Sequence, residues 1–124
     1  MDEMSQIGTK LRRATWATGV KLMHWCPGCD DVHGYIVEGG PPQWTFDGNY
    51  AAPTFHPSMR IYVTHFTNDD DKPLSQPVEE TLCHYFIKAG QIEFCGDSPH
   101  KLSGQNVDLP DWPYAPNSYV GIDE

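Results

Sequence analysis

The chain has 124 residues, about the size of one small domain. Its 8 basic and 17 acidic side chains give a formal net charge of −9 at pH 7. That balance excludes direct affinity for nucleic-acid phosphates or anionic membranes, because both kinds of binding need a surface rich in lysine and arginine. The acidic start and the lack of an apolar run of about 18 residues give no signal peptide or membrane span, so we expect a cytoplasmic or virion protein.

The composition favours strands over helices. Eleven Gly and eleven Pro leave little room for long helices, whereas four Trp, six Tyr and five Phe can build a small core. We therefore expect a mainly β, small single-domain antiparallel fold. Residues 1–14 are polar and predict a flexible or short helical N-terminal arm, and residues 15–124 then form the β domain.

Strand signals follow one another along the first half of the chain. Residues 15–25 are β-prone and lead directly into Cys26-Pro27-Gly28-Cys29, and further strands are expected at 32–38, 43–46 and 60–66. Residues 67–77 predict an acidic loop with a solvated tip at Asp69–Asp71. Three aromatic side chains in this half are expected to fill the core rather than to dock a partner, namely Trp44, Phe46 and Phe55.

The clearest hairpin lies at residues 81–95, with Ala89-Gly90 as a two-residue turn. This register gives one apolar face and one mostly polar face, and a three-residue loop would mix the two. Cys83 lies on the apolar face, while His84 and Cys95 face each other on the polar side. A last strand is expected at 106–109, after which Trp112 and Tyr114 pack back onto the sheet.

The Cys26-x-x-Cys29 pair predicts a zinc knuckle, because this spacing aims two thiolates at one point and Zn²⁺ takes four such ligands in a tetrahedron. A redox pair would follow a strand and open a helix, but loop and strand residues follow here. Reduced thiols without a metal remain the other alternative. The single domain expected over 15–124 is thus a zinc-binding β domain.

Spacing alone leaves several choices for the remaining zinc ligands. We favour a Cys₃His set composed of Cys26, Cys29, Cys83 and His100. Cys95, His84 and His33 stay open as alternatives for the last positions. His24, His56 and His65 are expected to be ordinary core or surface residues.

Five ordered segments carry a resemblance: residues 23–29, 44–49, 53–58, 83–87 and 100–110. Together they resemble a family of small phage and prophage proteins, whose members carry names such as ammonia monooxygenase or anaerobic dehydrogenase. The resemblance covers roughly residues 23–113. It implies a phage origin, a metal knuckle and a role for Cys26, Cys29, Cys83, His84, Asp97, His100 and Gln105, but it implies no reaction. The chain departs from the pattern at Asp47, His56 and Cys95.

The sequence alone favours a non-enzymatic function. A catalytic zinc needs an open position and a nearby base, for which Asp97 or Glu93 could serve, but the His-x-Glu of zinc deaminases is missing. A Ser/His/Asp combination can be assembled from any chain of this size and carries no weight here.

We therefore expect a phage-encoded, acidic, zinc-binding accessory protein that binds a protein with a basic surface. Such a partner could be a host defence or nucleic-acid-binding complex that it inhibits. A virion component and a small zinc-dependent hydrolase acting on a nucleotide or amide are the alternatives.

Overall fold

The computed structural model describes residues 3–114, with side chains from residue 8 onward. The described residues form nine strands and no helix, which confirms the mainly β antiparallel class. The strands are β1 (Glu3–Ile7), β2 (Leu11–Trp16), β3 (Gly19–Cys26), β4 (Asp31–Glu38), β5 (Thr45–Phe46), β6 (Phe55–Thr67), β7 (Pro73–Lys88), β8 (Gln91–Phe94) and β9 (Asn106–Asp108).

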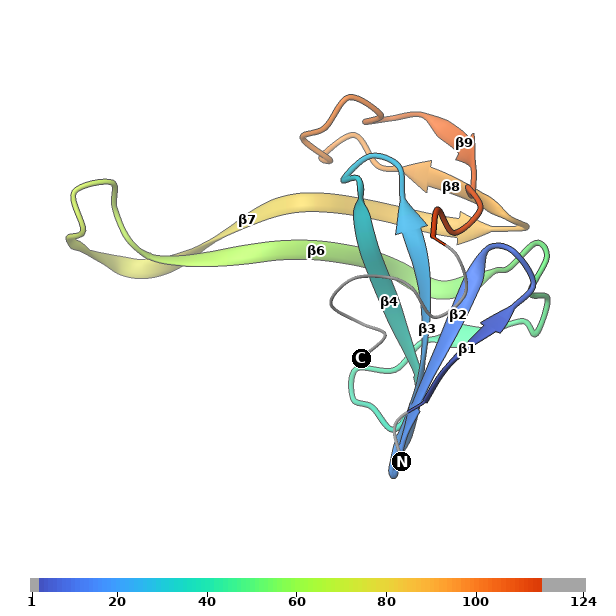
Figure 1. The fold of residues 1–124 in the computed structure, drawn as a ribbon. Coiled ribbons are helices and arrows are strands. Elements are labelled where there is room, and N and C mark those ends of the chain that lie inside the picture. The colour runs from blue at the N-terminus through green and yellow to red at the C-terminus, as the bar shows by residue number, and fades with distance from the viewer. Residues whose placement is uncertain (1–2, 115–124) are drawn as a thin grey trace.

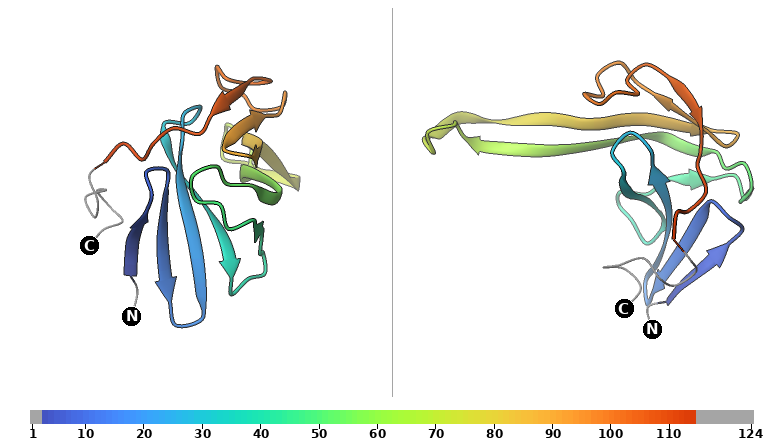
Figure 2. Two further views of the ribbon diagram at one scale, coloured as in Figure 1. Left: turned by 90° about the vertical axis from the view of Figure 1, so that its right-hand side faces the viewer. Right: turned by 45° about the horizontal axis from the view of Figure 1, so that its top comes forward.

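The strands build two sheets in which neighbours in sequence are neighbours in space (Figure 1). The first sheet has the order β1-β2-β3-β4 and the second the order β5-β6-β7-β8-β9. Strands β6 and β7 run far past the other strands as a two-stranded ribbon, which Figures 1 and 2 show from three sides. We call residues 61–80 of this ribbon the arm.

The core lies between the sheets. Leu22 and Tyr35 of the first sheet and Phe55 and Tyr85 of the second are fully or almost fully buried in one cluster. The Tyr35 and Phe55 rings stack with their centroids 4.1 Å apart. Trp44 and Phe46 pack against the same cluster, so the aromatic side chains fill the core as expected.

The described residues of the N-terminal segment form strands, not the flexible or short helical extension that we expected over residues 1–14. Strand β1 pairs with β2, and β2 pairs with β3. Leu11 is fully buried, and the guanidinium of Arg12 lies over the Trp112 ring at 5.1 Å from its centroid. An arginine covered by an aromatic ring behaves as a packing residue, so the polar composition of residues 1–14 was a poor indicator of a solvated tail. Trp112 itself is buried, so this part of the C-terminal segment packs back onto the first sheet as expected.

The acidic loop is shorter than predicted, because β7 already begins at Pro73 rather than after residue 77. Between β6 and β7, the Arg60 guanidinium lies 2.7 Å from the Glu79 carboxylate, and His65 Nε2 lies 2.8 Å from the Glu80 carboxylate. A ribbon exposed on both faces needs no alternation of polar and apolar residues, so its pairing leaves little trace in the sequence.

The hairpin at β7 and β8 has the predicted register, with Tyr85 opposite Phe94 and Lys88 opposite Gln91. Ala89 and Gly90 both have positive φ, 48° and 79°, as a two-residue type I′ turn requires. The apolar face is buried in the core, and it consists of Cys83, Tyr85, Ile87, Ile92 and Phe94. In the described part of the chain there is no helix that could cross a membrane.

Candidate active site and metal cluster

The Cys-x-x-Cys turn connects β3 to β4 and aims both thiols at the second sheet. Within the turn, the Cys29 N–H donates to Cys26 Sγ at 3.4 Å, and the Asp30 N–H donates to the Cys26 carbonyl at 2.8 Å. Gly28 lies directly against the ring of His100: a Cβ at this position would come within 3.0 Å of three ring atoms. A glycine is therefore required for the close approach of His100 to the turn.

The four predicted zinc ligands lie together. The Sγ atoms of Cys26 and Cys83 are 3.9 Å apart, and Cys83 Sγ is 3.3 Å from His100 Nε2. Cys29, Cys83 and His100 offer ligand atoms that all lie within 4.8 Å of one another. Zinc–sulfur bonds of about 2.3 Å in a tetrahedron separate two sulfurs by about 3.8 Å, which is close to the Cys26–Cys83 separation. Cys26 itself groups with Cys29 and His33, so the four predicted ligands form two overlapping groups that share Cys29.

The alternative ligands separate into two groups. His33 lies within the same 4.8 Å limit of Cys26 and Cys29, while its Nδ1 is 3.1 Å from the Tyr85 hydroxyl. Cys95 lies on the other side of the hairpin, in a separate group with His84 and Asp97.

The remaining histidines do not join the cluster groups among the described residues. His24 is fully buried, with Nε2 2.7 Å from the Tyr85 hydroxyl. Burial, followed by the charge of His33, lowers the pKa of His24 to about 4. His56 is exposed, and His65 pairs with Glu80 on the arm.

The cluster is electrostatically suited to a cation. The hydrogen bond from Cys83 lowers the pKa of the Cys26 thiol to about 3, and the same bond together with burial raises the pKa of Cys83. Burial and the charge of Cys26 raise the pKa of Cys29 to about 11. A buried thiolate beside two further thiols attracts a metal ion.

A second constellation lies on the outer face of β6 and β7, where three polar side chains form a continuous hydrogen-bonded row. Ser58 Oγ is 3.1 Å from His84 Nε2. His84 Nδ1 is in turn 3.1 and 3.2 Å from the two carboxylate oxygens of Asp97. A serine hydrogen-bonded to a histidine, which is in turn hydrogen-bonded to an aspartate, is the arrangement of the catalytic triad of serine hydrolases. This triad is recognised by its geometry and not by the positions of its residues in the chain.

A bulge in β6 places the serine. Phe55 pairs with Ile87 and Met59 with Tyr85, so three residues of β6 stand opposite one residue of β7. Such bulges re-aim side chains next to active sites. The backbone of Ser58 is also held by the Trp44 indole, whose Nε1–H donates to the Ser58 carbonyl at 3.2 Å.

A buried serine holds the other two members of the triad. Ser98 Oγ accepts a bond from the His84 N–H and donates one to the His84 carbonyl, both at 2.9 Å. Ser98 directly follows Asp97, so its two bonds fix the carboxylate-bearing loop against β7.

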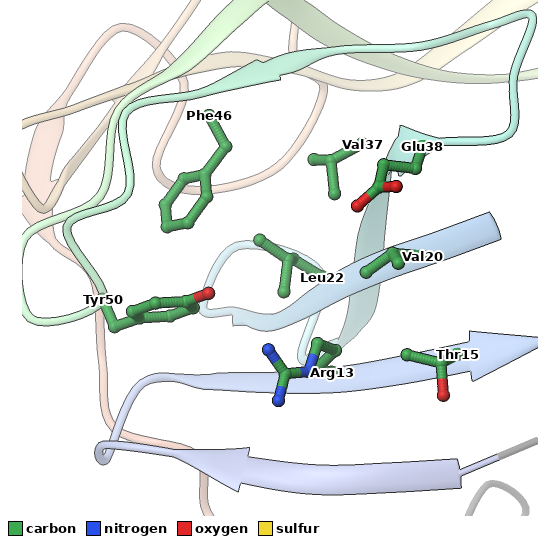
Figure 3. A pocket seen from close by; sticks show the side chains of 8 residues that line it. All are labelled: Arg13, Thr15, Val20, Leu22, Val37, Glu38, Phe46 and Tyr50. Atoms are coloured by element: carbon green, nitrogen blue, oxygen red, sulfur yellow. The ribbon is translucent and has the colours of Figure 1, made fainter.

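A cavity of about 300 Å³ lies elsewhere, on the first sheet below Phe46 and Tyr50, and none of the triad residues lines it (Figure 3).

The sequence alone indicates a role for His84 and Asp97 only around a metal, and it indicates none for Ser58. The serine lies in the segment Pro53–Ser58 that carries the resemblance, which is the only sequence signal for it. Its partnership with His84 depends on the bulge and on the pairing of two strands, which the sequence does not display.

The family comparison supports this second constellation. A family model described as bacterial ubiquitination-like system serine protease (BubE) matches residues 4–95. The chain belongs to the BubE family. The matched range includes Ser58 and His84, while Asp97 and His100 follow it. Comparison with curated proteins and with solved structures found no match. The phage origin implied by the resemblance stays a prediction.

Proposed function

We propose that the chain is a serine hydrolase that cleaves amide bonds in proteins of a bacterial ubiquitination-like system. The observation that carries this proposal is the row of hydrogen bonds from Ser58 through His84 to Asp97. The serine protease description of the BubE family supports the same reaction class. The proposal departs from the non-enzymatic accessory function favoured by the sequence alone.

Each triad residue has one role in the reaction. Ser58 Oγ attacks the carbonyl carbon of the substrate, and His84 Nε2 takes the hydroxyl proton. His84 then gives this proton to the leaving amine, so that an ester between Ser58 and the acyl group remains. Water repeats the attack with the same base, releasing the acid and restoring the Ser58 hydroxyl. Asp97 accepts the Nδ1–H bond and stabilises the charged imidazole in both halves.

We also propose that Cys26, Cys29, Cys83 and His100 hold one structural Zn²⁺. Four protein ligands close the coordination sphere, which is typical of a structural site. Two of the ligands come from the end of the first sheet and one from β7, so the ion would tie the sheets together. Cys83 directly precedes His84, and His100 follows Asp97 by three residues. The ion would therefore also hold the base and its carboxylate in position.

The arm supports a protein substrate with a basic surface. Arg60 of β6 stands opposite His84 of β7 in the sheet, and its guanidinium lies over the Tyr62 ring. The outer face that carries the triad therefore continues onto the arm. Tyr62 and Phe66 are 50% and 65% exposed there. Exposed apolar side chains of this size mark interaction surfaces. The arm carries one lysine against five acidic residues, Asp69, Asp70, Asp71, Glu79 and Glu80.

Hydrolysis of an activated ester tests the proposed reaction, because p-nitrophenyl acetate needs no specific binding surface. We expect Ser58→Ala to reduce kcat/KM by at least about 10³-fold while the far-ultraviolet circular dichroism spectrum stays unchanged. Ser75→Ala, at an exposed serine of the arm, is the matched control and keeps the wild-type rate. Equal rates for the Ser58 and Ser75 variants would contradict the proposal.

A further inference from the structure

Three different metal-binding side chains meet at the triad itself. His84, Cys95 and Asp97 each offer a ligand atom, and these atoms all lie within 4.8 Å of one another. The Cys95 N–H donates to the His84 carbonyl at 2.9 Å, which fixes the two residues side by side where the hairpin ends. The group lies apart from the Cys26 cluster, because the hairpin register sends Cys83 and Cys95 to opposite faces.

The chemistry of this group suits a zinc-like divalent ion. Imidazole nitrogen, thiolate and carboxylate are the ligand types that Zn²⁺ binds, and three of them leave a fourth position for water. The Asp97 side chain is 54% exposed, so an ion can reach the group from solvent. Burial, followed by the charges of Asp97 and Glu93, raises the pKa of the Cys95 thiol. The same two carboxylates attract a cation, although Lys88 lies 3.6 Å from Glu93 and offsets part of that charge.

We propose that His84, Cys95 and Asp97 form an inhibitory site for a divalent metal ion such as Zn²⁺ or Cd²⁺. This inhibition rests on the proposed hydrolase function, whereas the binding itself does not. The ion binds His84 Nδ1, the atom that faces Asp97, and the proton of Nδ1 moves to Nε2. Cys95 releases its thiol proton to solvent. With Nε2 protonated, His84 donates to Ser58 and can no longer accept its proton, so the triad is switched off.

The two metal groups should fill in order. The Cys26 cluster offers four buried or half-buried ligands, whereas the site at the triad offers three ligands and is open to water. We therefore expect the first equivalent of metal to enter the Cys26 cluster without inhibition. The second equivalent binds at the triad and inhibits hydrolysis, and a chelator that removes only the second equivalent restores the rate.

The test is a Cd²⁺ titration of the full chain with Cys95→Ser as the comparison. The ultraviolet band of the cadmium–thiolate bond reports binding, and p-nitrophenyl acetate hydrolysis reports the triad. In the wild-type protein the band should grow with both equivalents, and hydrolysis should fall only with the second. Cys95→Ser leaves the triad intact, so it should keep the metal-free rate, show no growth of the band beyond the first equivalent, and need at least tenfold more Cd²⁺ for half-inhibition.

Opposite results overturn the inference in a way that separates it from the proposed function. If the second equivalent adds no thiolate band, or if Cys95→Ser is inhibited at the wild-type concentration, the metal site is refuted while any hydrolysis still supports the triad. If the second band appears and Cys95→Ser loses it, but neither protein hydrolyses the ester, the metal site stands and the hydrolase proposal fails.

Discussion

Ser98→Ala should separate the positioning of the triad from its chemistry. The Ser98 side chain is 3% exposed, and its hydroxyl contacts both backbone groups of His84 at 2.9 Å. Alanine removes the acceptor of the His84 N–H and one donor to its carbonyl, which still accepts a bond from the Cys95 N–H. An unsatisfied buried donor costs about 1–3 kcal/mol and the second bond about 1 kcal/mol, so we expect a loss of about 2–4 kcal/mol.

That loss leaves the domain folded, because the free energy of unfolding of small domains is about 5–15 kcal/mol. The loop that carries Asp97 should move away from His84, and a displacement of this kind costs up to about 100-fold in rate. We therefore expect Ser98→Ala to lower kcat by about 10- to 100-fold with little change in KM.

Urea unfolding followed by tryptophan fluorescence measures the stability, and ester hydrolysis measures kcat and KM. Ser103→Ala is the matched control, because its hydroxyl binds only the carbonyls of Gly96 and Cys95 in the same loop. The control should lose less than about 1.5 kcal/mol and keep its rate. If Ser98→Ala and Ser103→Ala behave alike, or if Ser98→Ala changes neither quantity, the positioning role of Ser98 is wrong.

Asp97→Asn should lower kcat by about 10²- to 10³-fold. This is less than the roughly 10⁴-fold loss for a buried triad aspartate, because water can reach the half-exposed Asp97 carboxylate. An unchanged kcat would exclude Asp97 from the triad. Gly28→Ala should push the His100 ring away and release zinc at lower chelator concentration, while Gly96→Ala, where a Cβ meets open space, should not. Metal analysis of the purified chain should find one tightly held zinc that Cys29→Ser lacks. Phe66→Ser should change the free energy of unfolding by less than about 0.5 kcal/mol and leave ester hydrolysis intact, while slowing cleavage of a basic protein substrate.

The sequence predicted the features that depend on local pattern. Alternation around Ala89-Gly90 determined the register of the hairpin, because one of its faces is buried and the other is not. The Cys26–Cys29 spacing indicated a tight turn with two converging thiols, and the hairpin register placed Cys83 on the apolar face, opposite to Cys95. The four expected ligands lie in two neighbouring groups that share Cys29, while metal binding and the choice of ligands stay predictions.

The sequence did not predict the features that depend on long-range contact. Ser58 meets His84 only because β6 and β7 pair and a bulge turns the serine outward. Strand β2 was missed because Arg12, a charged residue, packs against the Trp112 ring as an apolar side chain would. The length of the arm was hidden because both of its faces are exposed, so no alternation marks it.

We propose Ser58 as a nucleophile that His84 activates. A fluorophosphonate probe forms a covalent bond only with an activated serine, and peptide mass spectrometry locates the adduct. We expect one adduct, on Ser58, that disappears in His84→Ala while the variant stays folded. An unlabelled wild-type protein, an adduct on another serine, or equal labelling of Ser58 in His84→Ala would contradict it.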